Sequence, residues 1–213
     1  MKIELEEGPK TKGIFLETGI LEDITVKVTR PEVFNILARE LKQEMRSRFR
    51  SLDDVKGDRT ARALRDFFWR VGIDPTKTRP SSEALLRRLL KKELPRINNL
   101  VDAGNLASTR TLIPVGIYDL DRIEGKLTLR ESSRGEGFRG IGGKDMELDD
   151  GIPVLSDEKG VIHIYPHRDC VRTMVTENCR NALIMTCGVP GMKIKLTEWA
   201  LDEVMHYWNQ VKE

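Results

Sequence analysis

Residues 95–121 read PRINNLVDAGNLASTRTLIPVGIYDLD, and this stretch is the most informative part of the 213-residue chain. Four Asx residues, Asn98, Asn99, Asp102 and Asn105, lie within eight positions of one another. Side chains of this type cap helices and brace turns, so one interpretation of the cluster is architectural. The other interpretation is that its last member, together with the hydroxyl residues that follow, lines a pocket.

Three parts of this region, taken together, resemble a known domain: residues 97–102 with Asn105, then Pro114, then residues 118–125. A fourth block, residues 181–184, matches the far end of the same domain. The chain resembles the B3/B4 domain of the phenylalanyl-tRNA synthetase β subunit over roughly residues 80–190. In that family the domain is an editing module, which hydrolyses tRNA charged with the wrong amino acid.

The resemblance implies an α+β fold, with a mainly antiparallel sheet and flanking helices. We expect strands and basic helices in residues 1–79, the B3/B4-like domain in residues 80–190, and a C-terminal helix in residues 191–213, all in one globular unit. No synthetase catalytic core accompanies these motifs, so the sequence predicts a free-standing member of the family.

Composition narrows the functional classes. The chain is 39% hydrophobic, which suffices for one domain with a real core. Three cysteines without a framework spacing argue against a disulfide scaffold and favour a reducing compartment. The N-terminal residues lack the apolar run of a signal peptide, and no stretch reaches the ~18 apolar residues of a membrane span. We therefore expect a cytoplasmic protein with no membrane association and no cofactor.

Basic residues are concentrated in one part of the chain. Residues 39–96 hold 17 basic and 9 acidic side chains, a density that suits contact with phosphates. The alternative is a solvated helical surface without a ligand. If tRNA binds here, the sequence predicts contacts from the basic helices, at Arg59, Arg62, Arg65, Arg87, Arg88 and Lys91.

Hydrophobic periodicity predicts the elements around this region. Apolar spacing of three and four indicates helices from Pro31, over residues 58–71, from Ser81 or Ser82, and from residue 197 to the end. Alternation indicates short strands over residues 14–20 and 24–28, and residues 161–165 suggest a strand buried on both faces. The glycines between 140 and 143 are typical of a hairpin turn rather than a phosphate-binding loop.

The chain departs from the family at the editing site. Aligned on the conserved motifs of the resemblance, the family's histidine falls on Gly116 and its glutamate on Met185, neither of which can act as acid, base or charge partner. The family's glycine-rich stretch falls on residues 165–169. The resemblance still implies a pocket for the amino acid, lined by Asn105, Ser108, Thr109 and Gly116.

A polar run after the buried strand offers replacement groups. A histidine such as His167 can titrate near neutrality and polarise a water, Asp169 can receive an α-amino group, and Thr173 can orient the water. Arg168 and Arg172 can hold a carboxylate or phosphate bidentately. The alternative is a loop fastened by an internal Arg–Asp pair. No fourth ligand joins His163, His167 and Cys170, so we expect no metal site.

These features favour a trans-acting aminoacyl-tRNA deacylase, with aminoacyl-tRNA as partner and the amino acid held in the pocket. Loss of the family histidine and glutamate favours a second hypothesis, a non-catalytic module that binds tRNA, RNA or an amino acid. A third is a protein-interaction adaptor, for which Trp199 is the candidate docking residue, while Trp208 lies on the apolar face of its helix. The oligomeric state is not predicted.

Overall fold

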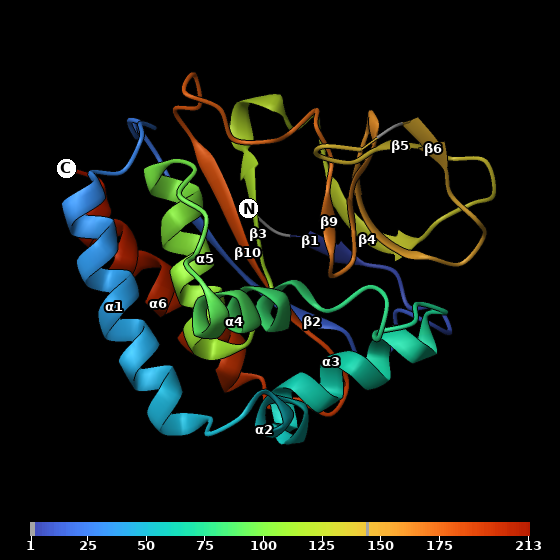
Figure 1. The fold of residues 1–213 in the computed structure, drawn as a ribbon. Coiled ribbons are helices and arrows are strands. Elements are labelled where there is room, and N and C mark those ends of the chain that lie inside the picture. Colours follow the sequence, from blue (N-terminus) through green and yellow to red (C-terminus); the bar gives the residue numbers. More distant parts are fainter. Residues whose placement is uncertain (1–2, 144) are drawn as a thin grey trace.

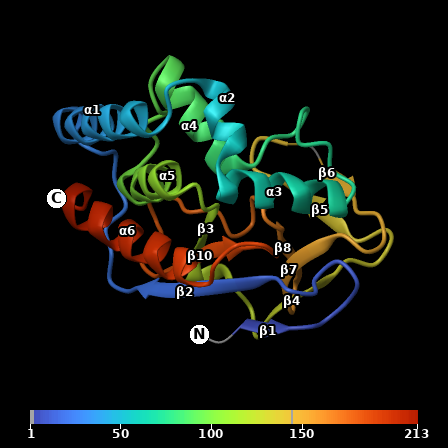
Figure 2. The same cartoon turned by 90° about the horizontal axis from the view of Figure 1, so that it is seen from below.

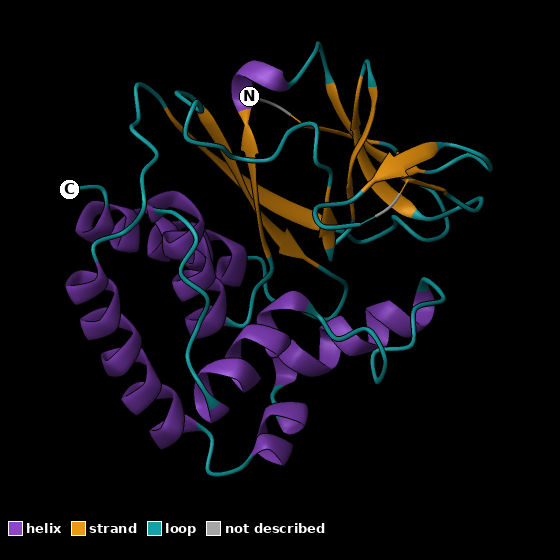
Figure 3. Cartoon of the chain, turned by 45° about the horizontal axis from the view of Figure 1, so that its top comes forward, coloured by secondary structure: helices purple, strands orange, loops and turns teal. Residues whose placement is uncertain are grey.

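The structure, a computed structural model, describes residues 3–143 and 145–213. No helix within these ranges combines the length and the apolar composition needed to cross a lipid bilayer. Figure 3 shows the helices gathered on one side of the molecule and the strands on the other. The described helices are α1 (Pro31–Arg48), α2 (Leu52–Gly57), α3 (Arg59–Arg70), α4 (Ser81–Lys91), α5 (Asn99–Thr111), the 3₁₀ turn η1 (Leu120–Arg122) and α6 (Lys195–Val211).

The strands form two larger sheets and one hairpin. The three-stranded sheet has the order β2-β10-β3 and is antiparallel throughout, whereas the five-stranded sheet has the order β1-β4-β7-β8-β9 with only β1 and β4 parallel. The hairpin pairs β5 with β6. The strands are β1 (Ile3–Leu5), β2 (Phe15–Leu21), β3 (Val115–Asp119), β4 (Leu127–Glu131), β5 (Gly137–Arg139), β6 (Asp145–Glu147), β7 (Pro153–Asp157), β8 (Gly160–Ile164), β9 (Arg168–Asp169) and β10 (Ala182–Gly188).

The central strand β10 separates two hydrophobic cores. Its residues alternate between the two faces of the sheet. Ala182 and Ile184 belong to the core shared with the helices, while Leu183 and Met185 belong to the core shared with the five-stranded sheet. The three-stranded sheet therefore lies between a helical layer and a second sheet (Figure 1).

Helices α5 and α6 cover the helical face of this sheet. Gly104 of α5 approaches β3 so closely that an added Cβ would meet the side chain of Ile117. Gly19 of β2 allows an equally close approach of Met205 from α6. Figure 2 shows α6 running along β2 and β10, with α1 and α4 farther out.

The predicted α+β class, with a mainly antiparallel sheet and flanking helices, is confirmed. The helix expected from Pro31 begins at that residue and is α1. The strand expected over residues 161–165 corresponds to β8, which is buried at four of its five positions. The expected hairpin turn connects β5 to β6.

The strand expected over residues 24–28 is wrong, because this segment has no strand partner. Its backbone is bonded instead to the start of α5. Asn99 accepts from the amide of Lys27 at 3.1 Å and donates to the carbonyl of Thr25 at 2.9 Å. The alternating apolar residues Ile24 and Val26 still enter the helical core. The bonds to the Asn99 side chain take the place of the strand pairing that the alternation suggested.

Candidate functional site

A cluster of polar side chains lies between the two larger sheets. The β8 and β9 strands pair His163 with Asp169, and the imidazole Nδ1 lies 2.7 Å from a carboxylate oxygen of Asp169. Tyr118 of β3 packs edge-on against the His163 ring from the facing sheet, with 6.1 Å between ring centroids. The three side chains therefore come from both sheets and meet in the interior.

Several atoms of this cluster have no hydrogen-bond partner among the described residues. They are His163 Nε2, the Tyr118 hydroxyl and, nearby in the chain, the buried Thr173 hydroxyl. A carboxylate only accepts hydrogen bonds, so Nδ1 of His163 carries the hydrogen atom of this contact, and Nε2 is the ring nitrogen without a partner among the described residues. An unpaired buried polar group costs roughly 1–3 kcal/mol, and such groups call for a structural or chemical explanation.

Gly116 makes room for the Tyr118 hydroxyl. A Cβ atom at position 116 would overlap that hydroxyl, so any residue other than glycine must displace the phenol. Position 116 is where the family resemblance places a histidine, and its ladder partner is Met185, which is fully buried. The phenol of Tyr118 thus occupies the space into which a side chain at position 116 would extend.

The phenols and the thiol of this interior are held in their neutral forms. Burial, followed by the charge of Asp169, raises the pKa of Tyr118 well above its usual value. Burial likewise raises the pKa of Cys187 and of Tyr165, whose hydroxyl donates to the carbonyl of Gly188 at 2.8 Å. At neutral pH, Tyr118 therefore acts only as a hydroxyl donor or acceptor.

The cluster reaches the surface through Asp169 and its neighbours. The Asp169 side chain is 29% exposed, and Arg168 beside it is exposed.

His167 packs edge-on against Phe68 of α3, and burial, with a smaller contribution from His163, lowers its pKa to about 4. His167 is therefore neutral at pH 7. Within residues 3–143 and 145–213, no three histidine, cysteine or acidic side chains gather closely enough to ligate an ion.

Arg172 is engaged inside the protein. Its guanidinium donates to both oxygens of the buried Asp157, at 2.9 and 2.6 Å. Burial alone would raise the pKa of Asp157, but the hydrogen bonds from Arg172 and from backbone amides lower it. Arg172 thus forms the internal Arg–Asp pair that was the alternative to binding a substrate carboxylate or phosphate.

The expected pocket residues on α5 lie elsewhere. Gly104 faces Val115 and Ile117, so α5 covers the face of β3 opposite to Tyr118. Thr109 is buried and donates to the carbonyl of Asn105 at 2.6 Å. Ser108 is buried with no partner for its hydroxyl among the described residues. The structure therefore does not gather Asn105, Ser108 and Thr109 into the cluster around His163.

The six basic residues predicted to contact tRNA fall into two groups. Arg65 and Arg87 both bind Glu83, a fully buried carboxylate, at 3.0 and 2.7 Å. The other four are exposed. This group comprises Arg59, Arg62, Arg88 and Lys91. Two of them, Arg62 and Arg88, donate to backbone carbonyls.

Sequence patterns alone did not select His163 and Tyr118 as site residues. His163 lies in an apolar strand, where alternation marks it as a core residue, and Tyr118 lies in a segment that identifies the family. The available signal was the spacing of His163 and Asp169 around a short turn, since such spacing places two strand residues opposite each other.

Comparisons with known proteins agree with the sequence motifs. The family model described as "B3/4 domain" matches residues 63–204. Phenylalanine–tRNA ligase beta subunits are similar to this chain. That of Mycoplasma genitalium is 31% identical over 109 residues, which cover 51% of this chain and 14% of that subunit. That of Fusobacterium nucleatum subsp. nucleatum is 27% identical over 161 residues, which cover 76% of this chain and 20% of that subunit.

A solved structure is also similar in part. An N-terminal fragment of the phenylalanyl-tRNA synthetase beta subunit from Pyrococcus horikoshii aligns with a TM-score of 0.45 and 19% identity, covering 53% of this chain and 40% of the fragment. The chain spans a fifth or less of the length of the two ligase subunits. The family match confirms the resemblance that residues 95–125 and 181–184 carry.

Proposed function

This chain belongs to the B3/4 domain family, and we propose on that basis that it is a trans-acting aminoacyl-tRNA deacylase. The reaction is hydrolysis of the ester that joins a wrong amino acid to the tRNA 3′ end. The curated relatives are phenylalanine–tRNA ligase beta subunits, which supports tRNA as the substrate class.

One observation carries the proposal: His163 Nε2 is buried with no partner in the described part of the chain, while Asp169 lies 2.7 Å from Nδ1. An imidazole oriented in this way is arranged to accept a proton from a water molecule. Asp169 keeps the ring in the required tautomer and stabilises the imidazolium that forms. His163 is then the general base, because the lowered pKa of His167, about 4, makes that imidazole a weak base.

Tyr118 supplies the second group. Its raised pKa keeps the phenol protonated, so its hydroxyl can donate a hydrogen bond to an oxyanion. Water attacks the ester carbonyl carbon as Nε2 takes one proton from it. The tetrahedral intermediate then collapses, the ribose hydroxyl leaves with the proton from Nε2, and the products are a free amino acid and uncharged tRNA.

Substrate enters from the Asp169 side of the cluster. One carboxylate oxygen binds His163, which leaves the other for an α-ammonium group, and the exposed Arg168 lies next in the chain. Because Nε2 is buried, hydrolysis requires a neighbouring segment to move aside while Asp169 keeps its contact with His163. The rate of turnover therefore depends on that segment as well as on the chemistry.

A second candidate function is binding without turnover, to tRNA, RNA or a free amino acid. It is favoured by the filling of the interior, since Tyr118, Tyr165 and Met185 are fully buried. The adaptor hypothesis gains less support: Trp199 is half-buried and donates to Glu203 at 3.1 Å, while Trp208 is a core residue.

The decisive experiment is deacylation of a panel of correctly and incorrectly charged tRNAs. We expect selective hydrolysis of a mischarged species and a loss of roughly 10²–10⁴-fold in rate for His163→Gln. His206→Gln is the matched control, because His206 is exposed on α6. Equal rates for the two variants would contradict the assignment of His163. Retention of tRNA with no hydrolysis across the panel would favour the binding module.

A further inference from the structure

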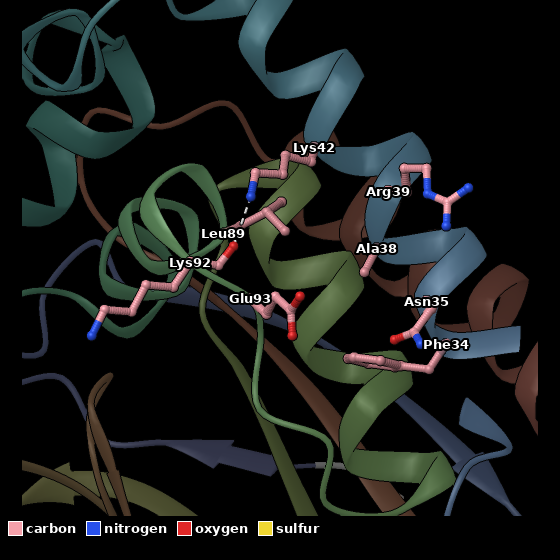
Figure 4. Close-up of a pocket in the computed structure, with 8 residues that line it drawn as sticks. All are labelled: Phe34, Asn35, Ala38, Arg39, Lys42, Leu89, Lys92 and Glu93. Atoms are coloured by element: carbon pink, nitrogen blue, oxygen red, sulfur yellow. Dashed lines mark hydrogen bonds between the residues drawn. The ribbon is translucent and has the colours of Figure 1, made fainter. Parts of the chain in front are cut away.

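A groove separates α1 from α4 on the outer surface of the helical layer (Figure 4). It encloses a cavity of about 300 Å³ with an apolar floor of Phe34, Ala38 and Leu89. Arg39 and Lys92 also line it, and Figure 4 shows their charged ends directed outward, away from this floor. The family match begins at residue 63, so α1 contributes one wall from outside the matched region.

The groove continues past the end of α4. An adjoining hollow of about 530 Å³ shares Lys42, Lys92 and Glu93 with the first and adds Arg88. Glu93 is the one acidic side chain lining either part, against four basic ones. The excess of positive charge therefore extends along the whole groove.

These cations differ from the other arginines of the helical layer. Among residues 3–143 and 145–213, none of the four forms an ion pair, whereas Arg65, Arg87 and Arg110 are each neutralised by a carboxylate. The unpaired charges of the layer thus include a contiguous set along one groove.

Backbone carbonyls hold two of these side chains in place. Lys42 donates across the groove to the carbonyl of Lys92 at 2.7 Å, and Arg88 donates to the carbonyl of Glu93 at 3.0 Å. Carbonyl oxygens carry no net charge, so each side chain keeps its full positive charge and further donors. The carbonyls at the end of α4 are occupied by these donors, which reduces their repulsion of an anion.

The spacing of the cations suits a polyanion. Arg39, Lys42 and Arg46 lie three and four residues apart on α1, which places them on one face of that helix. We propose that this groove binds the phosphate backbone of a nucleic acid, with an apolar floor beneath a ribose or base. The proposal rests on the proposed function, since it assigns the tRNA-binding surface of the same protein.

The assignment changes the expected contact residues. It removes Arg65 and Arg87, which bind Glu83, and keeps Arg88. It adds Arg39, Lys42 and Lys92. An acidic protein segment is the competing occupant, but it lacks the regular phosphate spacing and the planar groups that the apolar floor can accommodate.

The test measures binding of a fluorescein-labelled, uncharged tRNA transcript by anisotropy over a range of salt concentrations. For Arg39→Gln/Lys42→Gln we expect at least about tenfold weaker binding in low salt, and a salt slope smaller by about 1.5, as the loss of two phosphate contacts implies. Lys12→Gln/Arg134→Gln removes the same charge at exposed positions outside the groove, and we expect less than a twofold change. Arg39→Glu, at an exposed position, provides a second variant with intact packing.

Equal weakening by the groove pair and the control pair would overturn the proposal, and so would displacement of the tRNA by poly-glutamate at a matched charge concentration. The binding assay needs no hydrolysis, so failure of the deacylase proposal leaves it unaffected. Conversely, hydrolysis of an aminoacyl-adenosine ester by the groove variant at the wild-type rate would show that only tRNA binding was lost.

Discussion

Two polar clusters differ in how completely the structure satisfies their hydrogen bonds. At the start of α5, Asn98 caps the helix, Asn99 bonds residues 25–27, and Asp102 accepts from Thr29 at 2.5 Å and from the amide of Ile97 at 2.8 Å. Between the sheets, in contrast, His163 and Tyr118 each have a buried atom without a partner among the described residues. The first cluster is architecture, and the second has capacity left for a ligand.

The same distinction separates the basic residues. Glu83 neutralises Arg65 and Arg87 inside the helical layer, while the groove between α1 and α4 keeps its charge. A count of basic residues in the sequence treats all of these side chains alike, whether or not a carboxylate neutralises them. Hydrogen bonds and ion pairs in the folded protein indicate which of them remain free to bind something else.

The largest expected effect follows from breaking the buried ion pairs. Glu83→Gln leaves two arginines without their carboxylate, with side chains only 18% and 16% exposed, and should lower the free energy of unfolding by about 3–4 kcal/mol. Chemical denaturation measures this. Glu93→Gln, at an exposed acid just after α4, should change stability by less than about 0.5 kcal/mol. Similar small losses for both variants would contradict the structural role of Glu83.

Lowering the pH should destabilise the folded protein through His167. Its folded pKa of about 4 lies below the ordinary value of 6.5, so the unfolded state binds the proton more readily and stability falls as pH drops from 6.5 towards 4. This loss amounts to about 3 kcal/mol at the acid end. His167→Gln should flatten the pH dependence of unfolding by that amount, whereas His206→Gln should not. Parallel pH profiles for wild type and His167→Gln would refute the burial argument.

A smaller loss is expected at the satisfied cluster. Asn99→Ala removes the hydrogen bonds that hold residues 25–27 and should cost about 2 kcal/mol in the free energy of unfolding. Asn105→Ala, later on the same helix at a half-buried position, should cost less than 1 kcal/mol. Hydrogen exchange of the Lys27 amide offers a local measurement, and unchanged protection in Asn99→Ala would be inconsistent with the account.

The helices were largely predictable because their signals are local. A proline at the first turn of α1 and apolar residues three and four apart each act within a few residues, whereas α2 and α5 were not expected as helices. The strand expected at residues 24–28 failed because Thr25 and Lys27 bond to Asn99, a helix residue about 70 positions away, instead of to a strand. Alternation of apolar and polar residues does not indicate whether the backbone will bond to a neighbouring strand or to an asparagine side chain.

The candidate site was predictable only in part. The polar run of residues 163–173 pointed to the region of the His163 cluster and included Asp169. Its partner His163 depends on the register of a hairpin, and the position of Tyr118 depends on the packing of one sheet on another. The pairing of Arg65 with Glu83 likewise joins two helices, so neither residue alone reveals it.

The most direct test of the central claim, that the unpaired atoms around His163 serve chemistry, is Tyr118→Phe measured for stability and for deacylation. The Tyr118 hydroxyl makes no hydrogen bond within the described residues, so its removal should leave the free energy of unfolding within about 1 kcal/mol or raise it. Hydrolysis of the preferred mischarged tRNA should fall roughly 10²–10³-fold, as expected for loss of an oxyanion donor. A destabilised protein with unchanged hydrolysis would show that Tyr118 is architectural and would contradict the account.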